Sequence, residues 1–391
     1  MIAAANRGVR VRLLFDDLNT LLHDMTHVKL RDAALARIDR HPNLEIRVFN
    51  GWHARDLLGR VNEAVWDFER LNRRMHYKQM VADNRAAILG GRNIGVEYFG
   101  LFEEFNFLDL DALGVGPVAR QASAVFDRYW NSAWARGIRF AAAAPDAGAP
   151  SDAKNEALQR LLGDSRARRI LAGEQSWAGR VDALPSTLMP GRSVVHTDSP
   201  SRAAETRNHM PEAFRALLLS AQREVLITNA CIIPDAVFIA DLQRLADRGV
   251  TVRILTNSLA SHDVPAVNSH YEGWRVPILR TGAEVHELRA HPQVHAQLID
   301  TLPVVGGFAG LHTKAMVIDR RYSFVGSMNL DPRSEVINAE MGVIIDSPPL
   351  AEALAAAMQR DMSGANSWKV TLDDSPGSEE IAGDPAIFSA S

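Results

Sequence analysis

Histidine, lysine and aspartate recur at one spacing in two distant parts of the chain. In segments 76–83 and 312–319, lysine follows histidine by two residues and aspartate follows lysine by five. In both places an asparagine follows the histidine by 17 residues, at the end of the turns GGRN and GSMN. Only five residues of the chain are lysines, so matched lysines in matched surroundings would rarely arise by chance. The repeated set is His76, Lys78, Asp83 and Asn93 in the first copy and His312, Lys314, Asp319 and Asn329 in the second.

This set of side chains suits chemistry on a phosphodiester. Residues two apart on a strand face the same side, so each histidine points the same way as its lysine. If the two copies pack around a pseudo-two-fold axis, two imidazoles and two ammonium groups meet in one pocket. One histidine can then attack phosphorus and form a phosphohistidine. The other protonates the leaving alcohol and later activates an incoming alcohol or water. We favour His76 as the nucleophile.

Further polar residues are expected to support the two histidines. The lysines, the asparagines and Ser327 would hold the non-bridging oxygens of the phosphoryl group. Asp109 and Glu340 each precede a proline by eight residues and would hydrogen-bond the far nitrogens of the imidazoles, fixing their tautomers. Asp83 and Asp319 complete the repeated catalytic set. As residues at strand ends, however, they are expected to fix a turn rather than touch substrate.

The repeat also organises the elements that must position these residues. Segments 6–20 and 247–261 both place a glycine before an alternating, β-branched run, the pattern of a buried strand that follows a helix. The motif strand, a glycine turn and an acidic strand follow in each copy. Apolar spacing then predicts a closing helix over 118–130 and over 350–362. We therefore predict an α/β protein with two homologous α/β/α sandwich domains, related by a pseudo-two-fold axis, and an active site at their interface.

The repeat and the composition together predict the domain boundaries. We expect a first domain over 1–138, a connecting segment with a polar helix over 139–205, a second domain over 206–372 and a flexible tail over 373–391. The second copy begins with a helix, a strand and another helix before its matching strand, whereas the first has only a stub of helix. We expect the first copy to be shortened by about 25–35 residues.

Composition argues against several classes of protein. The chain of 391 residues has a net charge of −4, so it lacks the basic field that nucleic-acid binders need. Cys231 is the only cysteine, which rules out a disulfide framework. No apolar run approaches the roughly 18–20 residues that span a bilayer. The N-terminus lacks the apolar core of a secretory signal, so we expect a cytoplasmic protein.

Two weaker patterns have alternative interpretations. Segment 52–74 interleaves tryptophans and aliphatic residues with five arginines. It suits either a surface that meets anionic lipid headgroups or an ordinary amphipathic helix on the sheet, and its place just before His76 slightly favours the former. His291 and His295 have the spacing of a zinc pair, but no third ligand is evident and Pro292 disfavours a helix. We predict a solvated loop there and no metal site.

The two motifs and the residues around them resemble the phospholipase D superfamily. The segments GGRNIGVEYFG, FLDLDALGVGPV, FDRYWN, GSMNLDPRS and NAEMGVIIDSP are similar to bacterial cardiolipin synthases of that superfamily, over a range from Gly8 to about Asp374. The resemblance implies metal-independent transfer of a phosphatidyl group through a phosphohistidine, without a cofactor. It implies phosphatidylglycerol, phosphatidylethanolamine or phosphatidylcholine as substrates and substrate contacts from Ser327, Gly91 and Arg333. Gly91 departs from the family, because it replaces the serine of the usual glycine–serine pair.

Four functions remain to be compared. A phosphatidyltransferase that works as a monomer, peripherally bound to the membrane surface, is favoured. A hydrolytic phospholipase D would use the same residues with water as the acceptor. A nuclease or phosphodiesterase would need a basic face, which the net charge of −4 disfavours, so no nucleic-acid partner is expected. An inactive scaffold would not need both motifs intact.

Overall fold

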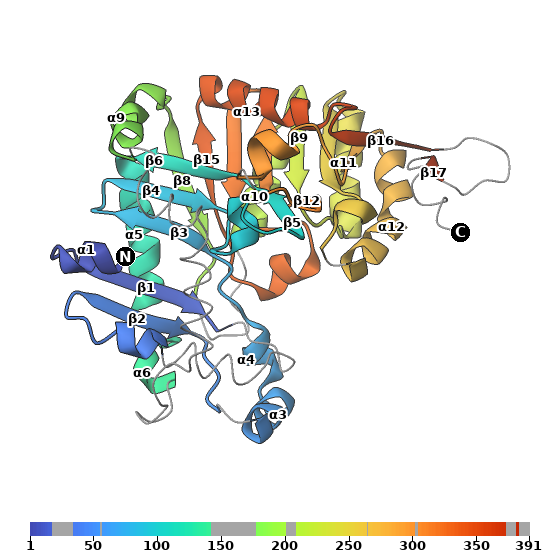
Figure 1. The fold of residues 1–391 in the computed structure, drawn as a ribbon. Coiled ribbons are helices and arrows are strands. Elements are labelled where there is room, and N and C mark those ends of the chain that lie inside the picture. The colour runs from blue at the N-terminus through green and yellow to red at the C-terminus, as the bar shows by residue number, and fades with distance from the viewer. Residues whose placement is uncertain are drawn as a thin grey trace. The chain divides into compact units, whose positions relative to one another are not determined.

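The chain forms two compact units, each built from two separate segments (Figure 1). The computed structural model describes residues 1–17, 34–54, 57–141, 177–200, 209–263, 265–301, 304–372 and 381–382. Unit 1 comprises Met1–Met75 and Phe126–Leu188, and unit 2 comprises His76–Val125 and Met189–Ser391. These units differ from the two sequence copies, because unit 2 contains both repeated motifs.

A nine-stranded sheet forms the centre of unit 2, in the order β17-β16-β11-β10-β9-β13-β14-β15-β8. Strands β9, β10 and β11 run parallel, whereas β13, β14 and β15 form an antiparallel meander. The strands are β8 (Arg192–Thr197), β9 (Glu224–Asn229), β10 (Thr251–Asn257), β11 (Glu284–Leu288), β13 (Lys314–Ile318), β14 (Tyr322–Gly326), β15 (Met341–Asp346), β16 (Ser367–Leu372) and β17 (Ile381–Ala382).

Helices cover both faces of this sheet. Val225 and Ile227 of β9 lie in a core shared with α10, α11 and α12, whereas Leu226 between them packs with α13. Successive side chains of a strand point to opposite faces, so a strand covered on both sides must be apolar throughout. The helices are α10 (His209–Leu219), α11 (Ala236–Asp247), α12 (Pro265–Arg280) and α13 (Pro348–Asp361).

The first sequence copy contributes a three-stranded sheet, β3-β4-β6, to unit 2. Leu89 and Ala119 from the first copy share one buried core with Val325 and Val343 of the large sheet. Strands β5 and β12, one from each copy, also pair in parallel. The elements are β3 (Lys78–Ala82), β4 (Ala86–Gly90), β5 (Phe105–Leu108), β6 (Asp111–Val115), α5 (Pro117–Trp130) and β12 (Phe308–Leu311). The two copies therefore meet inside unit 2.

Both copies use the same strand register around their motifs. The motif strand pairs antiparallel with the strand that ends in the glycine turn, and that strand pairs antiparallel with the acidic one. Gly90 lies opposite Asp111, and its counterpart Gly326 lies opposite Gly342. Asp111 and Gly342 each come two residues after the predicted acids, Asp109 and Glu340. The predicted order of motif strand, glycine turn and acidic strand is thus confirmed.

The copies differ in how the motif strand joins the parallel strands. In the second copy, β9 pairs with both β10 and β13 and holds them in one sheet. In the first copy, β1 (Val11–Asp16) and β3 are the counterparts of β10 and β13. No strand among the described residues corresponds to β9, and β1 and β3 belong to separate sheets. The strands of the first copy are therefore divided among separate sheets.

Unit 1 contains a small sheet in the order β1-β2-β7. β1 and β2 are parallel, β7 is antiparallel to β2, and Ile46, Val48 and Ile138 lie in the core of the unit. The other elements are α1 (Ile2–Asn6), β2 (Leu44–Phe49), α3 (Leu57–Trp66), α4 (Phe68–Asn72), β7 (Ala135–Gly137), α6 (Ile138–Ala141) and α9 (Trp177–Thr187).

The predicted α/β class is confirmed, and the predicted helices over 118–130 and 350–362 correspond to α5 and α13. Much of the predicted connection and most of the predicted tail lie outside the described residues. Across the part of the chain that the structure describes, no helix has both the length and the apolar character needed to cross a bilayer.

Candidate active site

The two repeated histidines lie in unit 2, and each is hydrogen-bonded to a buried carboxylate. Nδ1 of His76 lies 2.9 Å from Oε2 of Glu340, and Nδ1 of His312 lies 2.8 Å from Oδ2 of Asp109. The side chains of both acids are fully buried, whereas His76 and His312 keep 25% and 17% of their side-chain surface exposed. A carboxylate at Nδ1 favours the tautomer protonated there, which leaves Nε2 available for reaction.

Each carboxylate comes from the other sequence copy. His76 of the first copy bonds Glu340 of the second, and His312 of the second bonds Asp109 of the first. The sequence predicts that these acids orient the imidazoles, and the structure adds that the pairs are exchanged. One copy alone would therefore hold a histidine without its acid.

Glu340 is fixed through both its side chain and its backbone. Oγ of Ser327 donates to Oε2 of Glu340 at 2.5 Å, and Nδ2 of Asn338 donates to Oε1 at 3.3 Å. The carboxylate of Asp198 accepts hydrogen bonds from the backbone N–H groups of Glu340 and Met210, both at 2.8 Å. Burial raises the pKa of Asp198 to about 6. The sequence prediction missed Asp198 and Asn338, because neither belongs to the repeat.

Asp109 and His312 have more apolar surroundings. Oδ1 of Asp109 accepts a hydrogen bond from the backbone N–H of Leu110 at 2.8 Å. The ring of His312 meets Tyr98 edge-on at 4.9 Å and Phe107 at 5.3 Å between centroids. The second imidazole therefore packs between aromatic rings while its acid holds Nδ1.

Each lysine is anchored to the backbone of its own histidine. Nζ of Lys78 donates to the carbonyl oxygen of His76 at 2.8 Å, and Nζ of Lys314 donates to that of His312 at 2.5 Å. Lys314 is almost fully buried, and burial lowers its pKa. The negative charges of Asp109 and Glu340 act in the opposite direction but do not outweigh burial. These anchors fix the two ammonium groups beside the imidazoles.

The electrostatics favour neutral imidazoles beside ionised acids. Burial lowers the pKa of both histidines, and with the charge of Lys314 it brings the pKa of His312 to about 4. Burial disfavours the charge on Asp109 and Glu340, but their histidine and lysine neighbours outweigh it and hold both pKa values below the usual range. A phosphodiester anion entering the site would stabilise a protonated imidazole.

The two asparagines differ in their partners. Nδ2 of Asn93 donates to the hydroxyl oxygen of Tyr98 at 2.7 Å. Oδ1 of Asn329 is buried and has no hydrogen-bond partner among the described residues. The sequence prediction missed Tyr98, whose only signal is an aromatic residue soon after GGRN. Burial raises the pKa of its phenol, so Tyr98 stays protonated.

Gly91 and Arg333, predicted to contact substrate, have different settings. A Cβ atom at Gly91 would lie 3.1 Å from Oδ1 of Asp109 and 3.3 Å from Cδ of Lys314, which places this turn within the cluster. Arg333 begins η4 (Arg333–Ile337), four residues beyond Asn329, and its side chain is exposed.

Asp83 and Asp319 lie at the opposite ends of the motif strands from the lysines. The carboxylate of Asp319 accepts hydrogen bonds from the backbone N–H groups of residues 222–224, at 2.8 to 2.9 Å. Five residues of strand separate it from Lys314 by about 16 Å. Both aspartates have positive φ, of 52°, as turn residues do. Their place in the predicted catalytic set is corrected to a role in the turn, because strand length keeps them from the histidines.

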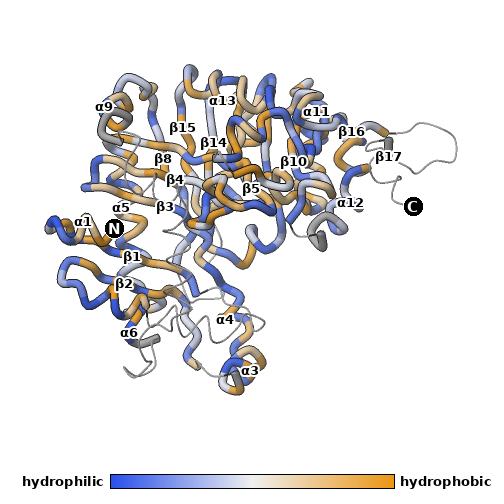
Figure 2. Tube along the Cα trace, in the orientation of Figure 1, coloured by the Kyte–Doolittle hydropathy of each residue, from blue (hydrophilic) through white to orange (hydrophobic). Residues whose placement is uncertain are grey.

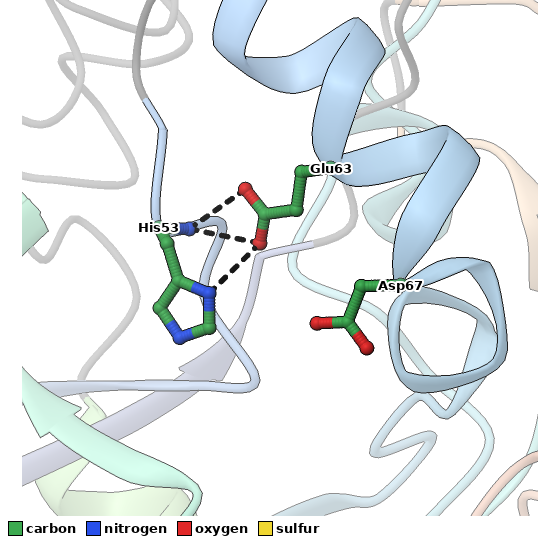
Figure 3. A group of neighbouring side chains, drawn as sticks. All are labelled: His53, Glu63 and Asp67. Atoms are coloured by element: carbon green, nitrogen blue, oxygen red, sulfur yellow. Dashed lines mark hydrogen bonds and ion pairs between the residues drawn. The ribbon is translucent and has the colours of Figure 1, made fainter.

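One group of described side chains has the spacing of a metal site: His53, Glu63 and Asp67 in unit 1 (Figure 3). Their ligand atoms lie within 4.8 Å of one another. Arg70, however, forms ion pairs with both carboxylates, through Nη2 to Glu63 and Nε to Asp67. Its guanidinium supplies the positive charge that a metal would bring, so we interpret the group as an ion-pair cluster.

The predicted solvated loop at His291 and His295 is wrong for one residue. His291 is exposed, but His295 is buried and its Nε2 lies 3.3 Å from Oδ1 of Asp300. The buried ring of His295 therefore lies beside a buried carboxylate rather than in a solvated loop.

The same fold is found in a solved crystal structure of another protein. The structure is similar to the crystal structure of phosphatidylserine synthase from Haemophilus influenzae Rd KW20, with a TM-score of 0.55 and 16% identity. The match covers 93% of this chain and 84% of that one. At this identity the likeness establishes the fold alone.

Sequence comparison identifies the family. The family described as "Cardiolipin synthase, PLD-like domain" matches residues 1–130 and 214–362, which hold both motifs. Cardiolipin synthase C from Escherichia coli strain K12 is 34% identical over 379 residues, covering 95% of this chain and 77% of that protein. An uncharacterized protein of Helicobacter pylori strain 26695 is 33% identical, covering 92% and 70%. The chain belongs to the cardiolipin synthase, phospholipase D-like family and is an enzyme of that superfamily.

Proposed function

We propose that this enzyme is a phosphatidyltransferase that joins two phospholipids, as a cardiolipin synthase does. The observation that carries the proposal is the pair of imidazoles, each bonded to a buried carboxylate from the other copy. Two oriented imidazoles allow two successive displacements at one phosphorus atom. The 34% identity to cardiolipin synthase C supports phospholipids as the substrates.

The first displacement breaks the donor phospholipid. Nε2 of one histidine attacks phosphorus, and the bond from phosphorus to the headgroup oxygen breaks. The other histidine, protonated at Nε2 once the anionic substrate is bound, gives its proton to the leaving alcohol. The products are a phosphatidyl group on histidine and a free alcohol such as glycerol or ethanolamine.

The second displacement builds the new lipid. The histidine that gave its proton now takes one from the hydroxyl group of an incoming phosphatidylglycerol. The resulting oxygen attacks phosphorus, and the bond between phosphorus and histidine breaks. Both imidazoles return to their starting states, and the product is a new phosphodiester that joins two lipids.

The cations and amides of the site stabilise the charge that develops on phosphorus. Lys78 and Lys314 would neutralise the non-bridging oxygens, and Asn93 and Asn329 would donate hydrogen bonds to them. Ser327, predicted from the sequence to contact substrate, is buried and donates its one hydroxyl proton to Glu340, so it acts through that acid instead. Because fixed ammonium groups supply the positive charge, we expect chelators to leave the rate unchanged.

Alanine variants of the histidines test the mechanism. His76→Ala and His312→Ala should each lower turnover of mixed phosphatidylglycerol and phosphatidylethanolamine by at least about 10⁴-fold, with the fold retained by circular dichroism. Normal activity in either variant would contradict the paired mechanism. A trapped phosphohistidine peptide would identify the nucleophile, which we propose to be His76.

Lipid mass spectrometry distinguishes transfer from hydrolysis. Cardiolipin as the product supports the proposed transferase. Phosphatidic acid alone would show that water is the acceptor and that the enzyme is a hydrolytic phospholipase D. If neither cardiolipin nor phosphatidic acid forms, the result would contradict both the transferase and the hydrolase.

A further inference from the structure

Helix α3 in unit 1 reverses the usual distribution of side chains on a surface helix. Leu58, Val65 and Trp66 are 81%, 66% and 82% exposed, whereas Arg60 is fully buried and Glu63 nearly so. An ordinary surface helix turns its apolar stripe inward and its charges outward. Figure 2 shows polar and apolar residues alternating along α3. Apart from the exposed Asn62, the outward side of this helix is therefore apolar, while its inward side is charged.

Ion pairs and hydrogen bonds hold α3 in this orientation. The carboxylate of Glu63 accepts from the backbone N–H of His53 at 3.1 Å (Figure 3). The same carboxylate pairs with the guanidinium of Arg70. The guanidinium of Arg60 lies 5.2 Å from the ring of Trp52, and its Nε donates to the carbonyl of Ala54 at 3.3 Å. Rotating the helix to bury its apolar side would separate these partners. The contacts within unit 1 therefore keep the apolar side exposed.

The exposed apolar side chains of α3 share one face of the helix with the exposed Asn62. Leu58, Val61 and Val65 follow one another at spacings of three and four residues, which places them on one face of the helix. Trp66 at the end of α3 and Phe68 at the start of α4 are also exposed, by 82% and 65%. We call these five apolar residues the α3 face.

We propose that the α3 face inserts into the headgroup region of a phospholipid bilayer. The choice of lipid rests on the proposed function, since the substrates of that reaction reside in a bilayer. Large apolar side chains with an indole N–H suit the boundary between acyl chains and water. A stable dimer needs roughly 20–30 residues a side, and five side chains around one short helix fall well below that.

Serine substitutions on the α3 face test the proposal. The triple variant Leu58→Ser/Val65→Ser/Trp66→Ser should bind vesicles of phosphatidylglycerol and phosphatidylethanolamine at least about tenfold more weakly than the unmodified chain in co-sedimentation. The matched control is Val181→Ser on α9, an exposed valine of the same unit, 59% against 66% for Val65. Its vesicle binding should stay within about twofold.

A site-specific probe reports on the same surface without removing it. An environment-sensitive fluorophore on Trp66→Cys should shift to the blue when vesicles are added, and the same label on Val181→Cys should not. The proposal would be overturned if the triple variant bound vesicles as tightly as the unmodified chain, or if the fluorescence of the label at residue 66 did not shift. A dimer that the triple variant dissociates without losing vesicle binding would also overturn it and assign the α3 face to a second copy.

A soluble substrate separates this proposal from the proposed function. With short-chain phosphatidylglycerol below its micelle concentration, the triple variant should retain turnover within about twofold, because the α3 face does not take part in the chemistry. Loss of turnover on vesicles alone supports the membrane role. An unmodified chain that binds vesicles through the α3 face but turns over neither substrate would refute the proposed reaction and leave the α3 face supported.

Discussion

The two halves of the candidate active site share one plan but surround their acids differently. In the His76 half, Glu340 accepts hydrogen bonds from Ser327 and Asn338, and Asp198 holds its backbone. In the other half, Gly91 stands where the repeat has Ser327, and His312 packs against aromatic rings. One acid is supported by hydroxyl and amide groups, and the other mainly by its own backbone and by packing.

This difference fits the division of labour that the proposed double displacement requires of the two histidines. If the two histidines had the same role, their acids would be expected to have the same surroundings. A double displacement instead assigns one histidine to phosphorus and the other to the proton, and the two tasks require different proton affinities. The unequal surroundings of Asp109 and Glu340 provide a physical basis for that asymmetry.

Among changes to the surroundings of the two histidines, the largest effect should come from removing the charge of either acid. Glu340→Gln and Asp109→Asn should each lower kcat roughly 10³- to 10⁴-fold, because an amide no longer fixes the tautomer or stabilises the imidazolium. Asp111→Asn is the matched control, since Asp111 bonds Arg92 at 2.7 Å rather than a histidine. The fall in kcat of Asp111→Asn should stay under about fivefold. Full activity in either acid variant would refute the role of the exchanged pairs.

Removing one hydroxyl should affect the His76 half. Ser327→Ala deletes a hydrogen bond to an ionised, buried carboxylate and should lower kcat roughly 10- to 50-fold. The matched control is Ser323→Ala in the same hairpin, because Ser323 is buried and its Oγ has no partner among the described residues. Steady-state kinetics of both variants measure the difference. Equal losses would mean that Ser327 acts only through packing.

Much of this arrangement follows from the sequence alone. The repeat predicts the motif hairpins and α13, because glycine turns and apolar spacing are local features. The exchange of Asp109 and Glu340 could not be predicted, because spacing within a copy does not say which copy's histidine each acid meets. Tyr98 was missed for a related reason: an aromatic residue in a glycine-rich loop is equally typical of simple packing.

Two further features depend on contacts distant in the sequence. The strands of the first copy lie in separate sheets because no described strand takes the place of β9 between β1 and β3. The orientation of α3 depends on partners outside the helix, Arg70 and His53, that a helical pattern does not contain. Local periodicity predicts that a helix has an apolar side, and only tertiary contacts decide where that side points.

The pH dependence should reflect the lowered proton affinity of His312. A neutral imidazole is the form that attacks or accepts a proton, and it is lost as pH falls through its pKa in the folded protein. With an ordinary pKa of about 6.5, only about 3% would be neutral at pH 5. With the pKa of about 4 for His312, most of it stays neutral at that pH. With His76 as the nucleophile, His312 must be neutral when it acts as the base of the second displacement. The acid limb of kcat/KM for the acceptor phosphatidylglycerol should therefore lie near pH 4, and a limb near 6.5 would contradict this.

Asp109→Asn sharpens the same measurement. The negative charge of Asp109 raises the pKa of His312, so its removal should move the acid limb to still lower pH in the residual activity. Glu340→Gln should leave the part of the profile that belongs to His312 in place. A shift to higher pH in Asp109→Asn would reverse the sign of this electrostatic assignment.

A smaller effect is expected at Tyr98, which supports the His312 half through Asn93. Tyr98→Phe removes the acceptor for Nδ2 of Asn93 but keeps the ring against His312, so kcat should fall about fivefold. Tyr322→Phe, at the start of β14, should leave kcat unchanged. Because the aromatic packing is retained, Tyr98→Phe should not move the acid limb, and a moved limb would mean that the hydroxyl itself affects His312.

The smallest effect should come from giving the His312 half the hydroxyl it lacks. A Cβ atom at Gly91 would crowd Oδ1 of Asp109 at 3.1 Å and Cδ of Lys314 at 3.3 Å, so Gly91→Ala should lower kcat by about threefold. Gly91→Ser brings the same crowding but adds a donor beside Asp109, and should recover part of that loss. The ratio of the two rates measures what a serine contributes in this half. If that ratio equals the loss in Ser327→Ala, the two half-sites are equivalent, and the division of labour inferred from their surroundings would have to be abandoned.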